Sequence, residues 1–240
     1  IRAARENGVK LMVAYRLHFE QGNLEAIRLV RSGEIGEARF FTSHFSQQVV
    51  EGNVRVGYPL AQGGGTVYDM GTYCINAARY LFEDEPVQVS AFSANNGEKR
   101  FEGVDEMTSV LLRFPGERLA EFTTSFGTAD TSTFTVAGTK GSLTLEPAYD
   151  YTAPIVHHLT IGGARQRREF PRRDQFGPEI LYFSDCVLNN REPEPSGLEG
   201  LADVRVIEAV YRSAREGKPV DLPQLEGVRR PAIDQNIYRP

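Results

Sequence analysis

The sequence lacks the glycine-rich motifs that would hold a nucleotide. A dinucleotide fold needs a strand followed by Gly-x-Gly-x-x-Gly at the start of a helix, with an acidic residue about 20 positions further on. The glycines at 63–65 follow a loop and have the wrong spacing, and those at 162–163 lie between predicted strands. No Walker-type phosphate loop and no serine nucleophile elbow occur either. We therefore expect this chain alone to bind neither NAD nor NADP.

Other features are scarce, and each shortage argues against a class of protein. No run reaches the roughly 18 apolar residues that a membrane helix needs. The net charge of −5 gives no basic field to attract nucleic acid or an anionic membrane. The four histidines have no ligand-like spacing to each other, to cysteine or to carboxylates, which predicts no metal site. Cys74 and Cys186 lie in apolar helical patterns, which favours free buried thiols and a cytoplasmic location.

The composition is ordinary for a folded protein, but the start of the chain is unusual. The 240 residues are 40% hydrophobic and 25% charged, which allows one large domain or two small ones. Residues 1–8 resemble the last turns of a helix that Gly8 closes, and nothing precedes them to begin that helix. We therefore expect the chain to be the back part of a longer polypeptide. The tail at 220–240 is rich in proline and arginine and is expected to be extended.

Hydrophobic periodicity and turn residues predict the elements. Strands are expected at 9–15, 37–47, 87–92, 107–114, 118–126, 131–137, 142–145, 155–161 and 166–170. Helices are expected at 23–31, 67–82, 176–188 and 201–214. Consecutive hairpins with helices segregated at both ends indicate an α+β fold. The expected architecture is one large, mostly antiparallel open sheet that contains about seven or eight of these strands, with helices on one face.

The glycine run at 63–65 precedes the most informative helix of the chain. Asp69 and Tyr73 are four residues apart and project from one face of that helix. A carboxylate beside a phenol, just after a flexible glycine run, suits proton transfer. The alternative is structural: Asp69 would favour the helix N-terminus through the helix dipole, and Tyr73 would be a partly buried core aromatic.

The strand at 118–126 has two different faces. Ala120, Phe122 and Phe126 lie on an apolar face, and the opposite face is polar but hardly charged. The threonines at 131, 133 and 135 form a similar row in the next strand. Two such faces can pack together as stacked sheets, so we expect a homo-oligomer, either a homodimer or a homotetramer, through the sheet face. The alternative is a solvated, threonine-rich face on a monomer.

Several motifs, taken in order, resemble one protein family. The matching stretches are 14–19 (Ala-Tyr-Arg-Leu-His-Phe), 63–65, 69–73 (Asp-Met-Gly-Thr-Tyr), 76–81, 174–176 (Asp-Gln-Phe), 203–205 (Asp-Val-Arg) and 207–211. Together they make the chain similar to the C-terminal part of the glucose–fructose oxidoreductase/inositol dehydrogenase (Gfo/Idh/MocA) family, nearest the glucose–fructose oxidoreductase branch. The resemblance extends from about residue 7 to about residue 219.

The resemblance implies a two-domain enzyme. Its N-terminal Rossmann domain would bind NAD or NADP and carry a catalytic lysine in a Glu-Lys-Pro motif, and both are absent from this sequence. Residues 1–240 would form a single substrate-binding and oligomerisation domain, with 1–16 as the end of a Rossmann-side helix and a linking strand. The implied activity is hydride transfer to or from a sugar or polyol, with this chain alone inactive. The alternative is a non-enzymatic sheet module used for association.

The resemblance also implies roles for individual residues. Tyr73 matches the acid/base position of the family, and Asp69 matches the carboxylate that hydrogen-bonds the substrate. Tyr15 and Arg16 match a pair beside the nicotinamide, and Arg55 is expected to reach the substrate unless it is a solvated loop residue. A tyrosine phenol ordinarily has a pKa of about 10, so Tyr73 would need help, normally from the missing lysine, to act near neutral pH.

Overall fold

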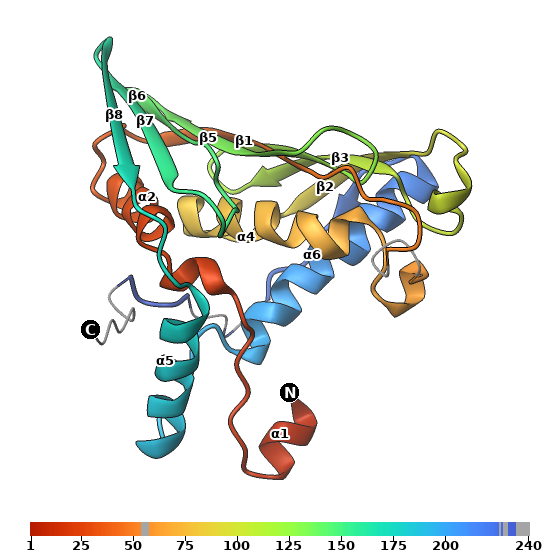
Figure 1. Ribbon diagram of the computed structural model, residues 1–240, viewed down its shortest axis with the longest axis horizontal. Helices are drawn as coiled ribbons and strands as arrows, with labels where there is room; N and C mark the ends of the chain where they lie inside the picture. Colours follow the sequence, from red (N-terminus) through yellow and green to blue (C-terminus); the bar gives the residue numbers. More distant parts are fainter. Residues whose placement is uncertain (54–57, 226, 228–229, 234–240) are drawn as a thin grey trace.

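One nine-stranded sheet dominates the structure, a computed structural model that describes residues 1–53, 58–225, 227 and 230–233. The strand order is β8-β7-β6-β5-β1-β4-β3-β2-β9, and every pairing is antiparallel except β1 with β4 (Figure 1). The strands are β1 (Ala38–Ser46), β2 (Gln88–Ala94), β3 (Met107–Phe114), β4 (Arg118–Ser125), β5 (Thr131–Gly138), β6 (Gly141–Leu145), β7 (Ile155–Ile161), β8 (Ala164–Phe170) and β9 (Val220–Asp221). The predicted α+β fold with a large, mostly antiparallel open sheet is confirmed.

Strand β1 occupies the centre of the sheet, which the sequence did not predict. It lies parallel to β4 and antiparallel to β5, so that Thr42 is opposite Glu121 on one side and Thr135 on the other. Strands β4 and β5 follow each other in the sequence, but β1 separates them in space. The sheet therefore consists of two antiparallel meanders, β2–β4 and β5–β8, joined through β1.

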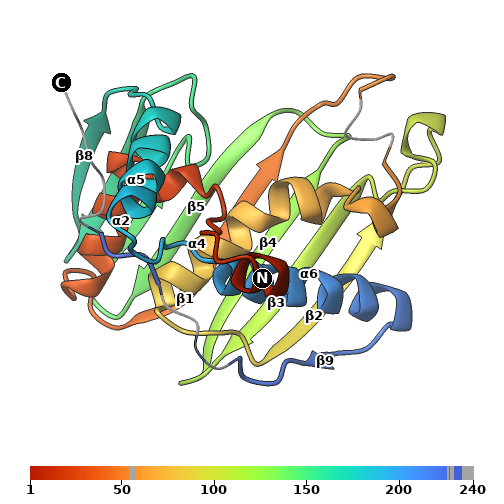
Figure 2. The same cartoon turned by 90° about the horizontal axis from the view of Figure 1, so that it is seen from below.

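The helices cover one face of the sheet. They are α1 (Arg2–Glu6), α2 (Gln21–Arg31), α4 (Thr72–Phe82), α5 (Phe176–Leu188) and α6 (Gly197–Glu216). Helices α2, α4 and α6 pack directly beneath the strands, whereas α1 and α5 lie farther from the sheet (Figures 1 and 2). This arrangement, with the helices on one face only, is the predicted one. Among the described residues, no helix covers the opposite face of the sheet.

The core lies between the sheet and α4 and α6. From α4, Cys74, Ala78 and Leu81 point into it, and Phe41 and Phe122 meet them from β1 and β4. This is the apolar face that the periodicity of residues 67–82 predicted. Cys74 and Cys186 are both buried and unpaired, as expected from their helical settings.

Helix α2 begins two residues earlier than predicted because Glu20 caps it. The two carboxylate oxygens of Glu20 accept hydrogen bonds from the backbone N–H groups of Gly22 and Asn23, each at 2.7 Å. These are donors at a helix start that have no partner within the helix. The periodicity locates the apolar face of a helix, but an acidic cap just before it sets the first turn.

The prediction of a buried strand at 9–15 is wrong. Val9 and Leu11 are exposed, and the segment makes only an isolated bridge, from Met12 to Ser196. An extended apolar run becomes a strand only where it lies along a sheet edge, and this segment instead connects α1 to the residues after 15 on the helix side of the sheet, away from the edge strands β8 and β9 (Figure 1). The second edge comes from the tail expected to lie over the surface, because Val220 pairs with Val89 of β2.

Candidate active site

The glycine run leads into a π-helical turn, η3 (Val67–Gly71), that continues directly into α4. A Cβ on Gly71 would lie 2.7 Å from Val67 Cγ1, so only glycine lets this wide turn close against the core. Gly65 has φ of +93°, and a Cβ there would lie 2.3 Å from Asp105 Oδ1. Single π-turns inside helices are frequent at functional sites. This one carries Asp69, and Tyr73 lies in the next turn.

A buried carboxylate clamps the start of this turn. Asp105 Oδ1 accepts hydrogen bonds from the Tyr211 hydroxyl at 2.9 Å and from the Thr66 backbone N–H at 3.3 Å. Its Oδ2 accepts from the Thr108 hydroxyl at 2.7 Å and from the Thr66 hydroxyl. The Tyr211 oxygen in turn accepts the Val67 N–H at 3.2 Å. Asp105, in the loop before β3, and Tyr211, from α6, thus fix the backbone that presents Asp69.

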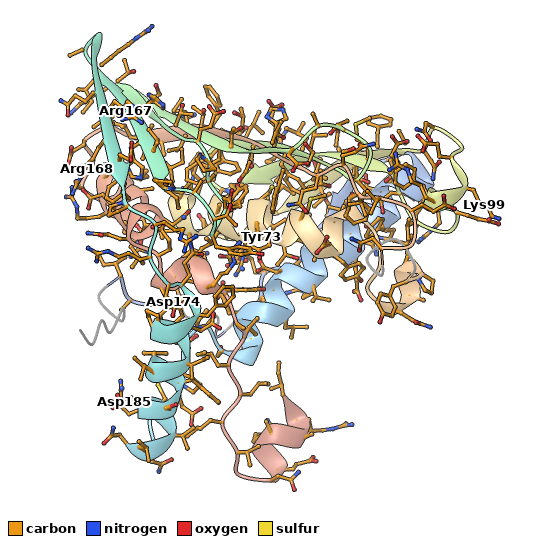
Figure 3. The ribbon with its side chains drawn as sticks, in the orientation of Figure 1. Tyr73, Lys99, Arg167, Arg168, Asp174 and Asp185 are labelled. Carbon is orange, nitrogen blue, oxygen red and sulfur yellow. The ribbon has the colours of Figure 1, made fainter. Side chains whose placement is uncertain are left out.

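Asp69 and Tyr73 line a cavity of about 610 Å³ beneath the sheet. Figure 3 shows Tyr73 in the middle of the molecule, between the sheet and the segment that carries Arg16. The cavity is lined by Arg16, Phe45, Ser46, Gln47, Asp69, Met70, Tyr73, Asp130, Thr131, Ser132, Glu146, Pro147, Tyr149, Asp150, Tyr151 and Thr152. Its size and its mixture of aromatic, hydroxyl and carboxylate groups suit a small polar ligand.

A second cavity of about 170 Å³ adjoins the first. Arg16, Asp69 and Tyr73 line both, so these three residues lie at the junction. Tyr15 lines only the smaller cavity. The structure thus brings together four of the five residues selected from the sequence. Arg55, the fifth, lies outside the described residues.

Arg16 is held firmly in η1 (Arg16–Phe19), and its side chain is buried. Its guanidinium donates to the Gln175 side-chain oxygen and, at 2.6 Å, to the Tyr149 carbonyl. The same group lies 5.1 Å from the Tyr73 ring centre and 5.2 Å from that of Tyr151. These cation–π contacts hold the rings of Tyr73 and Tyr151 against the buried guanidinium.

Sequence reasoning missed the residues that hold Arg16. Gln175 belongs to the Asp-Gln-Phe motif that carried part of the family resemblance, but no role was assigned to it. Tyr149 and Tyr151 lie in the loop between β6 and β7, which is too long for a tight hairpin. Aromatics gathered in such a loop are the one local signal that could have drawn attention to them.

Tyr15 connects the smaller cavity to a buried charge cluster. Burial and the hydrogen bond to Asp203 raise the pKa of Tyr15. Arg79, which is fully buried, lies 2.8 Å from Glu85 and 2.7 Å from Glu199, and it also pairs with Asp203. Burial raises the pKa of Glu199 to about 7 despite the nearby Arg79. Arg79 therefore pairs with three carboxylates at once.

His18 has a structural role beside the smaller cavity and lines neither of the two cavities. It is 3% exposed, and its Nε2 lies 3.0 Å from Asn76 Oδ1. Its ring centre lies 4.0 Å from that of Tyr80. Burial lowers the pKa of His18 to about 3, so the ring is neutral at neutral pH.

The described residues contain no group of three or more His, Cys, Asp or Glu side chains arranged to hold a metal ion. Within the same part of the chain, no helix combines the length and the apolar character needed to cross a membrane.

Comparisons with known proteins place this geometry in a family context. Residues 23–144 match the model of the GFO/IDH/MocA C-terminal domain. D-xylose 1-dehydrogenase [NADP(+)] of Haloarcula marismortui is 31% identical over 227 residues, which are 92% of this chain and 63% of that protein. D-xylose 1-dehydrogenase (NADP(+)) 2 of Haloferax volcanii is 32% identical over 90% of this chain and 65% of its own length. The chain therefore spans somewhat less than two thirds of these relatives.

A solved structure supports the same relationship. The aldose-aldose oxidoreductase from Caulobacter crescentus, complexed with glycerol, superposes with a TM-score of 0.85 and is 36% identical. The match covers 92% of this chain and 66% of that one. KijD10, a 3-ketoreductase from Actinomadura kijaniata, has a TM-score of 0.79 at 24% identity, which shows a shared fold alone.

Proposed function

Because the chain belongs to the GFO/IDH/MocA family, we propose that it is the substrate-binding part of an NAD(P)-dependent oxidoreductase that acts on a sugar or polyol. The observation that carries this proposal is the junction of the two cavities, where Arg16, Asp69 and Tyr73 converge. The names of the relatives support it, since they describe NADP-dependent xylose dehydrogenases and an aldose oxidoreductase.

The two cavities suit two ligands, the substrate in the larger one and the nicotinamide of the cofactor in the smaller one. The larger one has room for a sugar, whereas the cavity of about 170 Å³ beside Tyr15 and Arg16 has room for a nicotinamide ring but not for a whole dinucleotide. The described residues thus form one side of a nicotinamide site, and they include no glycine-rich loop that could bind the phosphates of the dinucleotide. When bound, NADP or NAD would supply the hydride acceptor or donor, and a separate Rossmann domain would hold the rest of the dinucleotide.

The residues of this chain would position the substrate and exchange its proton. The Asp69 carboxylate would accept a hydrogen bond from a substrate hydroxyl and so orient the reacting carbon. The Tyr73 hydroxyl would exchange a proton with the hydroxyl or carbonyl oxygen at that carbon as the hydride leaves or arrives. Arg16 would hold the Tyr73 ring through the contact at 5.1 Å.

Exposed apolar side chains support a further domain on the side of the site away from the sheet. Val9 is 60% exposed, and on α5 Ile180 and Leu188 are 63% and 84% exposed. In Figure 1, α1 and α5 extend away from the sheet on that side. The intact mass separates this proposal from a non-enzymatic sheet module. A mass about 13–15 kDa above the 26.7 kDa of this chain, one small Rossmann domain, would favour the enzyme.

The decisive substitution is Tyr73→Phe, measured in the polypeptide that includes the cofactor domain. Loss of the hydroxyl should lower kcat by about 10²–10⁴-fold with little change in KM, because general acid–base catalysis contributes that much. Tyr58→Phe is the matched control, since Tyr58 does not line either cavity. A kcat for Tyr73→Phe within about threefold of the parent would refute the assignment.

The uncovered sheet face supports a homo-oligomer, either a homodimer or a homotetramer. Phe40, Phe92, Leu111 and Leu119 are 47%, 81%, 45% and 42% exposed on strands β1–β4. The register aligns Phe92 with Ser109, and Ser109 with Thr123, on this face. The face is therefore more apolar than the threonine rows predicted from the sequence, and burying it against a second copy would remove this apolar area from water.

Thr123→Arg tests the oligomer. Thr123 is on the uncovered face, where its hydroxyl lies 2.8 Å from that of Ser109. An arginine there would be buried without a partner in an oligomer, so the assembly should dissociate. Light scattering at micromolar concentration measures the mass. A parent mass near 26.7 kDa would contradict the proposal, and Glu117→Arg, in the turn before β4, is the control for an arginine introduced away from this face.

A further inference from the structure

The larger cavity is lined by more negative than positive charge. Four carboxyl groups face it, from Asp69, Asp130, Glu146 and Asp150, against one cation, Arg16, among the described residues. Asp130 and Glu146 are exposed. Burial opposes ionisation of Asp150, but hydrogen bonds from the backbone N–H and hydroxyl of Thr152 outweigh it and lower its pKa. The described lining of the cavity therefore carries net negative charge at neutral pH.

Arg16 is poorly placed to bind an anion. Its two terminal nitrogens already donate to the side chain of Gln175 and the carbonyl of Tyr149. Its plane is engaged by the rings of Tyr73 and Tyr151, and the residue is only 6% exposed. A phosphate is typically bound through an arginine fork that faces it with two free N–H groups. This guanidinium serves as internal scaffolding instead.

Tyr151 supplies an accessible aromatic surface in the same cavity. The residue is 53% exposed although it lines the cavity. Its ring is held by Arg16 at 5.2 Å and by an edge contact with Phe176 at 5.8 Å. A sugar ring has an apolar C–H face and a rim of hydroxyls, so it can rest on an aromatic ring while its hydroxyls donate to carboxylates.

We propose that this cavity takes an uncharged sugar whose ring rests on Tyr151, and that its acidic rim excludes phosphorylated and nucleotide-linked sugars. The inference rests on the proposed function, because it concerns the same cavity. It adds a substrate class and a binding residue, Tyr151, and it gives Asp130 and Glu146 a selective role. Like charges brought close to a charged ligand are a common means of rejecting it.

The first test measures binding of D-glucose and D-glucose 6-phosphate to this chain by saturation-transfer NMR, which detects millimolar affinity. Salt is set at about 0.01 M and about 0.1 M, over which the Debye length falls from about 30 Å to about 10 Å. At low salt, glucose 6-phosphate should bind at least about tenfold more weakly than glucose, and the ratio should narrow at higher salt because screening weakens the repulsion.

Paired substitutions assign the effect to named residues. Asp130→Asn with Glu146→Gln should lower the ratio of the two dissociation constants by about threefold or more, since two repelling charges are removed. Glu102→Gln with Glu117→Gln removes the same charge outside the cavity and should leave the ratio unchanged. Tyr151→Ala should weaken glucose binding by about fivefold to tenfold. Tyr58→Ala is its control, because Tyr58 has the same 53% exposure but does not line the cavity.

The outcomes separate this inference from the function on which it rests. Glucose 6-phosphate that binds at low salt as tightly as glucose would overturn the charge selection and leave the proposed oxidoreductase intact. Equal loss of glucose binding in Tyr151→Ala and Tyr58→Ala would remove Tyr151 from the site. If neither sugar binds the parent chain, the substrate class and the proposed sugar site fall together.

Discussion

The clamp on the π-turn predicts that Asp105→Asn is strongly destabilising although it preserves the shape of the side chain. Asp105 is 7% exposed and accepts from four donors: the hydroxyls of Tyr211, Thr108 and Thr66, and the Thr66 backbone N–H. An asparagine keeps one acceptor oxygen and places an NH₂ group where the other oxygen was. Two of the four donors would then face a donor.

The neighbouring hydroxyls cannot relieve this conflict by rotating to accept a hydrogen bond from the asparagine NH₂ group. The Thr66 hydroxyl already accepts from the Thr124 hydroxyl at 2.9 Å, and that of Thr108 lies 2.8 Å from the Ser93 hydroxyl. Hydrogen bonds to charged groups contribute about 1.5–3 kcal/mol each. Loss of two such bonds, partly offset by rearrangement, should lower the free energy of unfolding by about 3 kcal/mol.

Urea unfolding followed by circular dichroism gives this free energy from the midpoint and the slope. Glu102→Gln, an exposed acid in the same loop, is the control and should change stability by less than about 0.5 kcal/mol. The ¹H–¹⁵N resonances of Asp69 and Tyr73 should shift in Asp105→Asn, because the clamp fixes the backbone before them. A stability loss below about 0.5 kcal/mol for Asp105→Asn would refute the clamp.

Two further predictions concern buried charge. Arg79→Met should cost about 3–5 kcal/mol in urea unfolding, because it leaves Glu199 and Asp203 buried without their shared cation. A cost no larger than that of the exposed Arg113→Met would contradict the network. The pKa of His18 is about 3 in the folded chain and about 6.5 in the unfolded chain. Between these values only the unfolded chain binds a proton on His18, so the free energy of unfolding decreases as the pH is lowered below 6.5. At pH 5 this protonation should lower the free energy of unfolding by about 2 kcal/mol. The decrease should be absent in His18→Gln when the free energy of unfolding is measured against pH, and parallel curves for the two proteins would contradict the prediction.

Local patterns in the sequence predicted the features that depend on local energies. The apolar residues at 107–114 and the turn that follows them predicted β3, and the periodicity at 176–188 predicted α5, each with the bounds that the structure has. The glycine run and the four-residue spacing likewise brought Asp69 and Tyr73 to one cavity. Side-chain direction follows from position along a helix or strand, so such features can be inferred one segment at a time.

Only the tertiary structure decided which distant segments meet. The insertion of β1 between β4 and β5, and the contact of Arg16 with Gln175, 159 residues away, leave no local signal. The same holds for the clamp that joins Asp105 to Tyr211, 106 residues apart. The predicted strand at 9–15 is absent for the same reason, because this segment does not lie along an edge of the sheet, where it could pair. The sequence thus determined most of the elements and the placement of Asp69 and Tyr73 on one helical segment, and long-range packing determined the walls of the cavity and the surroundings of its charges.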